Sequence, residues 1–98
     1  MKIADIPKPL LAAFRDGMVI PAMPLALTAD RALDARRQKA LVRYYVAAGA
    51  GGLAVGVHST QFAIRDPAVE LLEPVLRLCG DAADAWTAGR APGVLTIA

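Results

Sequence analysis

Apolar residues along the chain fall into short blocks that alternate with amphipathic segments. The first block, "MVIPAMPLAL" at residues 18–27, is almost entirely apolar and is typical of a strand buried on both faces of a parallel sheet. Pro21 and Pro24 cannot donate to a sheet ladder, so we expect an irregular strand that is regular mainly over residues 18–23. Two more apolar blocks, at residues 53–57 and 94–98, predict short strands.

Two amphipathic helices are predicted between these strands. Asp34 can cap the first, over residues 35–48, and Gly49 supplies its stop signal. The face of this helix that packs on the sheet is predicted to carry Leu41, Val42, Tyr45 and Ala48. Asp66 and Pro67 are typical of the start of a second helix. Its buried stripe is predicted to consist of Leu72, Val75, Leu76 and Cys79.

The order of these elements, β-α-β-α-β, predicts a parallel α/β sheet with right-handed crossovers. We expect residues 1–98 to form one partial domain, with a lead-in helix over residues 1–16 and the first β/α units over residues 17–98. A doubly wound sheet and a β/α barrel share this pattern. The glycines Gly49, Gly51 and Gly52 follow the first helix instead of the first strand, which disfavours a dinucleotide cradle. No cofactor is predicted, and no Cys/His spacing suits a metal.

A polar cluster, His58, Ser59, Thr60 and Gln61, directly follows the second predicted strand. In both architectures functional sites form at the carboxyl ends of the strands, which puts the cluster on the functional face. Hydroxyls and the backbone N–H groups of a turn can hold a small carboxylate, and an imidazole can donate a hydrogen bond or transfer a proton. The alternative is that the cluster satisfies loop backbone groups while His58 faces solvent. The residues alone favour neither interpretation.

Several segments from Gly17 onward are arranged as in a known enzyme family. They are the buried first strand "MVIPAMPL", the loop that leads to Asp34, and "LVRYYVAAGAGGLAVGV", a helix followed by glycine and a strand. In these features the chain resembles the N-terminal part of the dihydrodipicolinate synthase/N-acetylneuraminate lyase family, the class I pyruvate-dependent aldolases. The resemblance covers most of this chain but only about the first third of a family member.

The family carries a Gly-Thr-Thr-Gly-Glu signature after this strand, and its threonines bind the carboxylate of pyruvate. An ungapped alignment places His58 and Ser59 at the threonines and Gln61 at the glutamate, whereas a shift of one residue matches Ser59 and Thr60 to the threonines. Both registers stay open. In either one the second glycine and the glutamate are missing, which is typical of a divergent subgroup. The resemblance thus implies that His58, Ser59, Thr60 and Gln61 bind pyruvate or a related 2-oxo acid.

The resemblance also implies a fold and a reaction. It predicts that the chain is the N-terminal β-α-β-α-β portion of a (β/α)8 TIM barrel, truncated after about three strands. In the family the Schiff-base lysine and its partner tyrosine lie on later strands, beyond Ala98, and Lys2, Lys8 and Lys39 are not suited to replace the lysine. We expect the complete parent to be a homo-oligomeric carbon–carbon lyase, and this chain alone to hold no catalytic residue and to be inactive. The alternative is a non-catalytic β/α binding or assembly module, stable only as an oligomer.

The composition of the chain is relevant to its location in the cell. Of the 98 residues 56% are hydrophobic, yet no run approaches the roughly 20 apolar residues of a membrane span, and the N-terminus does not resemble a signal peptide. No membrane partner is therefore predicted. Cys79 is the single cysteine, so we expect no disulfide, a cytoplasmic location, and a core role for this side chain instead of a catalytic one.

The charge of the chain is relevant to the partners that it could bind. The net charge of +2 is too small to imply a nucleic-acid partner. The richest basic cluster is Arg36, Arg37, Lys39 and Arg43, opposite the apolar face of the first helix. We interpret it as a solvated surface, because no aromatic or glycine-rich element accompanies these residues in the sequence.

Overall fold

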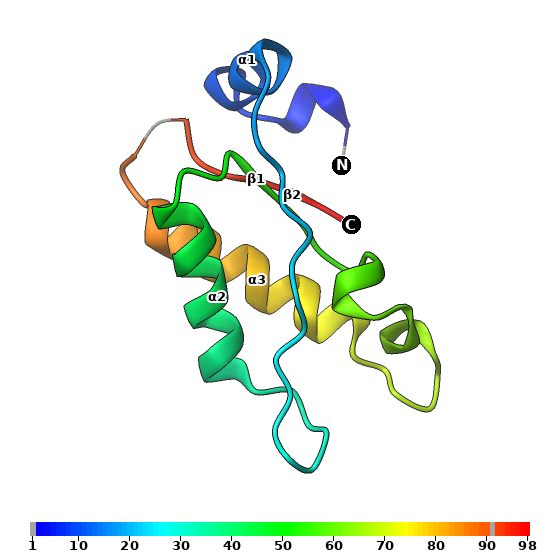
Figure 1. Cartoon of the computed structure of the whole chain (residues 1–98). Coiled ribbons are helices and arrows are strands. Elements are labelled where there is room, and N and C mark those ends of the chain that lie inside the picture. The colour runs from blue at the N-terminus through cyan, green and yellow to red at the C-terminus, as the bar shows by residue number, and fades with distance from the viewer. Residues whose placement is uncertain (1, 91) are drawn as a thin grey trace.

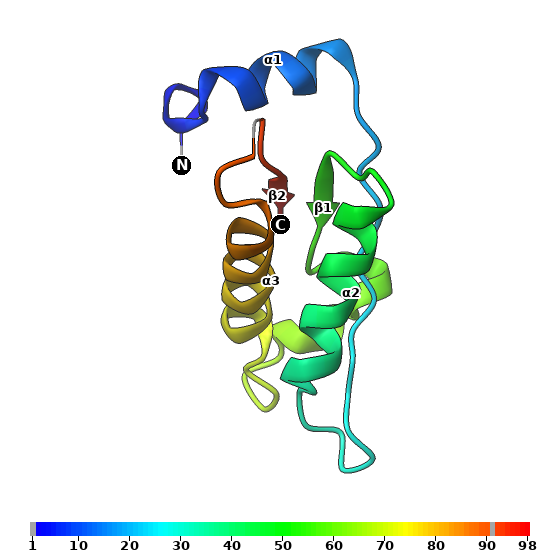
Figure 2. The same cartoon turned by 90° about the vertical axis from the view of Figure 1, so that its left-hand side faces the viewer.

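The computed structural model describes residues 2–90 and 92–98, which form three α-helices and a two-stranded parallel sheet (Figure 1). The helices are α1 (Lys8–Asp16), α2 (Ala35–Ala47) and α3 (Leu72–Thr87), and the strands are β1 (Gly52–Ala54) and β2 (Leu95–Ile97). Helices α2 and α3 pack on each other and beside the sheet, whereas α1 crosses the end at which the strands begin (Figure 2). Single 3-10 turns are η1 (Ile3–Asp5), η2 (His58–Thr60) and η3 (Phe62–Arg65).

The prediction of a β-α-β-α-β portion of a TIM barrel is wrong, because the described residues form two strands instead of three. Strands β1 and β2 are parallel neighbours, with Leu53 opposite Thr96. The expected first strand, residues 18–23, is an extended segment that runs beside β1. It makes one isolated parallel bridge, between Ala22 and Ala54. The sheet is therefore smaller than the apolar pattern suggested.

Proline explains why residues 18–23 do not form a regular strand. The carbonyl of Pro21 accepts a hydrogen bond from the amide of Ala54 at 3.0 Å, and the amide of Met23 donates to the carbonyl of Ala54 at 2.8 Å. In a parallel ladder of this register, residue 21 would also donate to the carbonyl of Gly52. Proline has no N–H for that bond, so the ladder is interrupted and the segment stays irregular.

The helix predicted over residues 35–48 is confirmed as α2. Asp34 caps it: its carboxylate accepts from the backbone amide of Arg37 at 3.0 Å and pairs with the Arg37 guanidinium at 3.2 Å. Gly49 follows the helix with a φ of 101°, a conformation that a side chain disfavours. The local signals at both ends were therefore sufficient to place this helix.

The predicted start of the second helix at Asp66 and Pro67 is wrong, because α3 begins at Leu72. The Asp66 carboxylate caps one isolated turn instead, accepting from the amide of Ala68 at 2.8 Å. That turn ends at Glu70, whose φ of 52° breaks the helical path. The apolar stripe itself is as expected, since Val75 and Cys79 are fully buried and Leu72 and Leu76 are partly buried.

The core lies between the sheet, α2 and α3, and the extended segment closes it. Its fully or nearly fully buried members are Met23, Val42, Leu53, Val55, Val75, Cys79 and Ala83. Gly52 on β1 sits tightly between its neighbours: a Cβ there would come within 3.0 Å of the Leu95 carbonyl oxygen and 3.1 Å of the Ile20 side chain. A residue without a side chain therefore lets both neighbours approach β1 closely.

One buried polar side chain, Gln38 on α2, holds the extended chain that follows residue 23. Its Oε1 accepts from the amide of Ala26 at 2.8 Å, and its Nε2 donates to the carbonyl of Pro24 at 2.9 Å. The same nitrogen lies 3.6 Å from Sγ of Cys79 on α3. Gln38 thus satisfies backbone groups that have no ladder partner and links them to both packed helices.

Replacing Gln38 by leucine should lower the free energy of unfolding by about 1–3 kcal/mol, because the partly buried amide of Ala26 and the carbonyl of Pro24 lose their partner. Urea unfolding followed by far-UV circular dichroism measures the change. The exposed neighbour gives the control, since Lys39→Leu should alter stability by no more than about 0.5 kcal/mol. Equal stability of the two variants would contradict the anchoring role of Gln38.

Candidate functional site

The polar cluster lies just past the carboxyl end of β1, in two successive 3-10 turns. The amide of Thr60 donates to the carbonyl of Val57 at 2.9 Å, and the amide of Gln61 donates to the carbonyl of His58 at 3.1 Å. Gln61 connects η2 to η3 with a φ of 77°, in the left-handed region that non-glycine residues seldom adopt. On either side of this change in backbone direction, neighbouring side chains lie in different environments.

Thr60 is directed inward. Its side chain is fully buried, and its hydroxyl donates a hydrogen bond to the carbonyl of Met23 at the end of the extended segment. That carbonyl would otherwise be a buried acceptor without a strand partner. In this structure the Thr60 hydroxyl therefore fastens the loop to the core.

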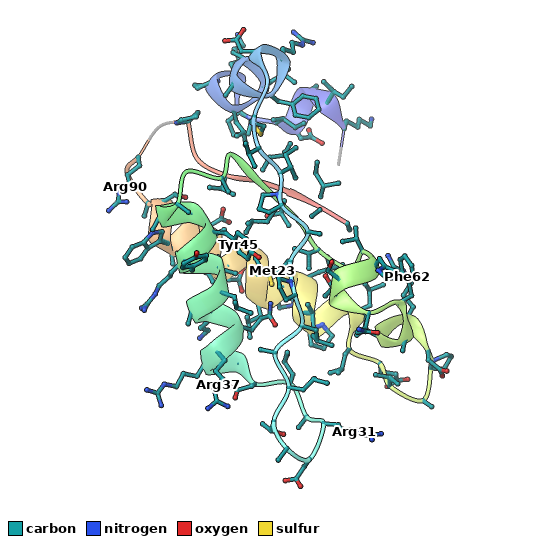
Figure 3. All side chains as sticks on the ribbon, viewed as in Figure 1. Met23, Arg31, Arg37, Tyr45, Phe62 and Arg90 are labelled. Carbon is teal, nitrogen blue, oxygen red and sulfur yellow. The ribbon has the colours of Figure 1, made fainter. Side chains whose placement is uncertain are left out.

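His58 is directed outward. Its imidazole is exposed and packs edge-on against the Phe62 ring, with 5.9 Å between the ring centroids. Phe62 is exposed as well, and the Arg65 guanidinium lies 5.6 Å from its centroid. Arg65 also donates to the carbonyl of Gly56, which holds the loop back toward β1. Phe62 is seen at the outer side of this loop in Figure 3.

Ser59 and Gln61 share an open groove of about 530 Å³ with a third polar side chain, Arg31. Within the described residues, neither Ser59 nor Gln61 uses its side chain in a hydrogen bond, so the hydroxyl, amide and guanidinium groups of these three lining residues have donors available. The rest of the lining is apolar and consists of Pro24, Leu25, Leu27, Ala63, Ile64, Val69 and Leu71.

A short loop before α2 positions Arg31. Leu27 and Leu33 form an antiparallel bridge at its base, and Thr28 closes it: the Thr28 amide donates to the carbonyl of Ala32 at 2.8 Å, and the Thr28 hydroxyl accepts from the Ala32 amide at 3.2 Å. Arg31 itself has a φ of 63°. The side chain projects from this loop, as Figure 3 shows.

The structure separates the four residues singled out from the sequence into three environments. Ser59 and Gln61 line the groove, Thr60 lies in the core, and His58 lies on the outer surface of the loop. Sequence reasoning missed Arg31, which lies in a polar loop far from the cluster along the chain. No local pattern around Arg31 distinguishes it from an ordinary surface arginine.

A second hollow lies beside this groove but has a different electrostatic character. It measures about 590 Å³, and its charged lining consists of Arg65, Asp66, Glu70, Glu73 and Arg77. Arg77 is already paired with Glu73, at 2.6 Å, so two further carboxylates oppose the one remaining guanidinium. An anionic ligand would be repelled there, whereas the groove at Ser59 contains no carboxylate.

Other candidates for chemistry do not gather into a site. Lys2, Lys8 and Lys39 are exposed, and none of them lines the groove. Burial raises the pKa of the Cys79 thiol, which keeps it protonated and unreactive at neutral pH. Across residues 2–90 and 92–98 there is no cluster of His, Cys, Asp and Glu that could hold a metal, and no helix with the length and apolarity needed to cross a membrane.

Comparisons of the chain with protein-family models, curated proteins and solved structures found no match.

Removing the hydroxyl of Thr60 and removing that of Ser59 should change the free energy of unfolding by different amounts. Thr60→Val keeps the shape of the side chain but leaves the Met23 carbonyl unpaired, and should lower the free energy of unfolding by about 1–2 kcal/mol. Ser59→Ala removes an exposed hydroxyl and should change it by less than about 0.5 kcal/mol. Urea unfolding of both variants tests this, and an equal loss of stability would contradict the separate environments of the two residues.

Proposed function

We propose that this chain binds a small carboxylic acid of the 2-oxo class, such as pyruvate, in the groove at Ser59, Gln61 and Arg31. The observation that carries the proposal is that these three donor-bearing residues line one groove whose other lining residues are apolar. A guanidinium can take both oxygens of a carboxylate, while a hydroxyl and an amide can reach a carboxylate or the adjacent carbonyl. The apolar wall suits the carbon end of such an acid.

The resemblance to the dihydrodipicolinate synthase/N-acetylneuraminate lyase family supports the same class of ligand. We infer that the chain supplies the carboxylate-binding part of such a lyase, and that any imine-forming lysine and its tyrosine lie outside these residues. The described residues form two strands, so no barrel is proposed for them. A homo-oligomeric parent and a cytoplasmic location belong to this proposal, the latter supported by a single cysteine with no disulfide partner.

Pyruvate should bind the wild-type chain, and binding should depend on the carboxylate. Isothermal titration with pyruvate measures the affinity, and methyl pyruvate, which lacks the charge, should bind at least about tenfold more weakly. Arg31→Gln should weaken pyruvate binding by a similar factor. The matched control is Arg15→Gln on α1, an exposed arginine outside the groove, which should leave the affinity unchanged.

The same protein samples test whether the chain forms a covalent imine with pyruvate. Sodium borohydride with pyruvate should add no mass to the chain, because no lysine lines the groove. A wild-type chain that is folded but binds no pyruvate, or an Arg31→Gln variant that binds it as well as wild type, would overturn the proposal. A borohydride-trapped adduct would overturn the assignment of the lysine to another part of the protein.

A second candidate, a non-catalytic assembly module, is favoured by apolar residues at the open sides of the sheet. Val19 on the extended segment is 71% exposed, and Ile97 on β2 is also exposed. In the part of the chain that the structure describes, no further strand pairs with either side. Unpaired edges of this kind are ready to pair with a second copy.

If the chain assembles through its sheet edges, sedimentation velocity should show an oligomer that grows with concentration. Val19→Lys should shift it to the monomer, because a charge on the edge opposes pairing. Tyr44→Lys, an equally exposed position on the outer face of α2, is the control and should leave the oligomer intact. A wild-type monomer at every concentration would contradict the assembly module and would leave pyruvate binding as a separate question.

A further inference from the structure

The outer face of α2 carries cations that have no acidic partner. Arg36, Lys39 and Arg43 are exposed, and none of them forms an ion pair within residues 2–90 and 92–98. Their spacing places them on one side of the helix, about one turn apart. Together with Ala40 they line a surface hollow of about 590 Å³. Each side chain therefore keeps its full set of N–H donors for an external anion.

Folding brings an aromatic ring to these cations. Trp86 lies near the end of α3 and is 38% exposed, and its ring centroid is 5.5 Å from the guanidinium of Arg43. Arg90, just after α3, lies 5.6 Å from the same centroid. In Figure 3 Arg90 and Arg37 lie on the same side of the molecule as α2, Arg90 toward the top of the view and Arg37 toward the bottom. We call Arg36, Lys39, Arg43, Trp86 and Arg90 the basic–aromatic patch.

The aromatic ring removes one premise of the sequence-based interpretation. The basic cluster was interpreted as a solvated surface because no aromatic residue accompanies it along the chain. Trp86 is remote in sequence from Arg43 and reaches it only because α2 packs against α3. The net charge of +2 is a sum over the whole chain, in which carboxylates that lie elsewhere, such as Glu70 and Glu73, offset the cations of this patch.

We propose that the basic–aromatic patch binds single-stranded nucleic acid, with phosphates at Arg36, Lys39 and Arg43 and a base against the exposed part of Trp86. Proteins that bind single strands without sequence preference combine a row of cations with an aromatic ring on which a base stacks. Arg43 and Arg90 lie over the Trp86 ring, so a base would stack on the uncovered part of the ring or on a guanidinium plane, which can itself stack on a base. This activity is independent of carboxylate binding in the groove at Ser59.

The surroundings of the patch favour a single strand over other polyanions. A duplex keeps its bases paired and stacked inside, so Trp86 on the protein surface would have no base to stack on. An anionic membrane would attract these cations, but the apolar face of α2, which includes Val42, is buried in the core and cannot insert to strengthen that contact. The ion pair of Arg37 with Asp34 leaves Arg37 outside the patch.

Trp86 is the only tryptophan of the chain, so its fluorescence reports on the patch directly. Titration of the full chain with a fluorescein-labelled oligothymidylate of about 20 nucleotides should raise the anisotropy of the probe and quench Trp86. The logarithm of the association constant should fall with the logarithm of salt concentration with a slope of about −2 to −3, as for three or four phosphate contacts on a single strand.

Substitutions distinguish binding at the patch from an effect of the overall net charge. Lys39→Glu with Arg43→Glu should weaken binding at least about tenfold, and Trp86→Leu should weaken it about tenfold by removing the stacked base. The matched control is Lys8→Glu with Arg15→Glu, which changes the net charge equally on exposed positions of α1 and should have less than about a twofold effect. Far-UV circular dichroism confirms that each variant is folded, and Trp86→Phe, which keeps an aromatic ring, should retain most of the affinity.

Three outcomes would overturn the proposal. The first is a folded wild-type chain that gives neither an anisotropy change nor Trp86 quenching at about 20 mM salt. The second is an equal loss of affinity in the α1 control, which would assign binding to net charge alone. The third is patch-dependent binding to vesicles of phosphatidylcholine and phosphatidylserine without binding to the oligonucleotide, which would make the patch a membrane contact.

Discussion

The hydrogen bonds of one buried side-chain amide, that of Gln38, hold the irregular chain after residue 23 against the two packed helices. Pro21 interrupts the backbone ladder of the extended segment, and the chain after residue 23 continues beside the core without a strand partner. Gln38 supplies the missing partners by accepting from Ala26 and donating to Pro24. A buried amide with all of these bonds made is stabilising, while the same group with one bond missing would cost more than it contributes.

The groove depends on this anchoring. Pro24 and Leu25, which form part of its wall, lie within the stretch that Gln38 fixes, and the loop that carries Arg31 continues from it. On the opposite wall, Thr60 attaches the polar cluster to the Met23 carbonyl, one residue before Pro24. The two walls therefore meet at the same short piece of irregular backbone.

Local signals in the sequence were sufficient for some elements and not for others. The Asp34 cap and Gly49 defined α2, because capping and stop signals act within a few residues. The apolar block at residues 18–27 did not become a strand, since a single missing N–H at Pro21 outweighed its apolar pattern. Asp66 and Pro67 have the chemistry of a helix start, but the path after them turns at Glu70 before α3 begins. Sequence position put the polar cluster after β1, but it did not indicate that Thr60 would turn into the core while Ser59 and Gln61 line the groove.

The distribution of charge explains why a sequence total misrepresents the surface. Three cations of α2 line one hollow without a carboxylate, whereas Asp66, Glu70 and Glu73 gather in another beside η3 and α3. At physiological ionic strength, charges interact over only about 8 Å, so each of these surfaces acts on a ligand almost independently of the other. A net charge of +2 therefore describes neither surface. What an anion meets is set by helix packing, which puts Trp86 beside Arg43 and gives the cationic face an aromatic contact that neither helix has alone.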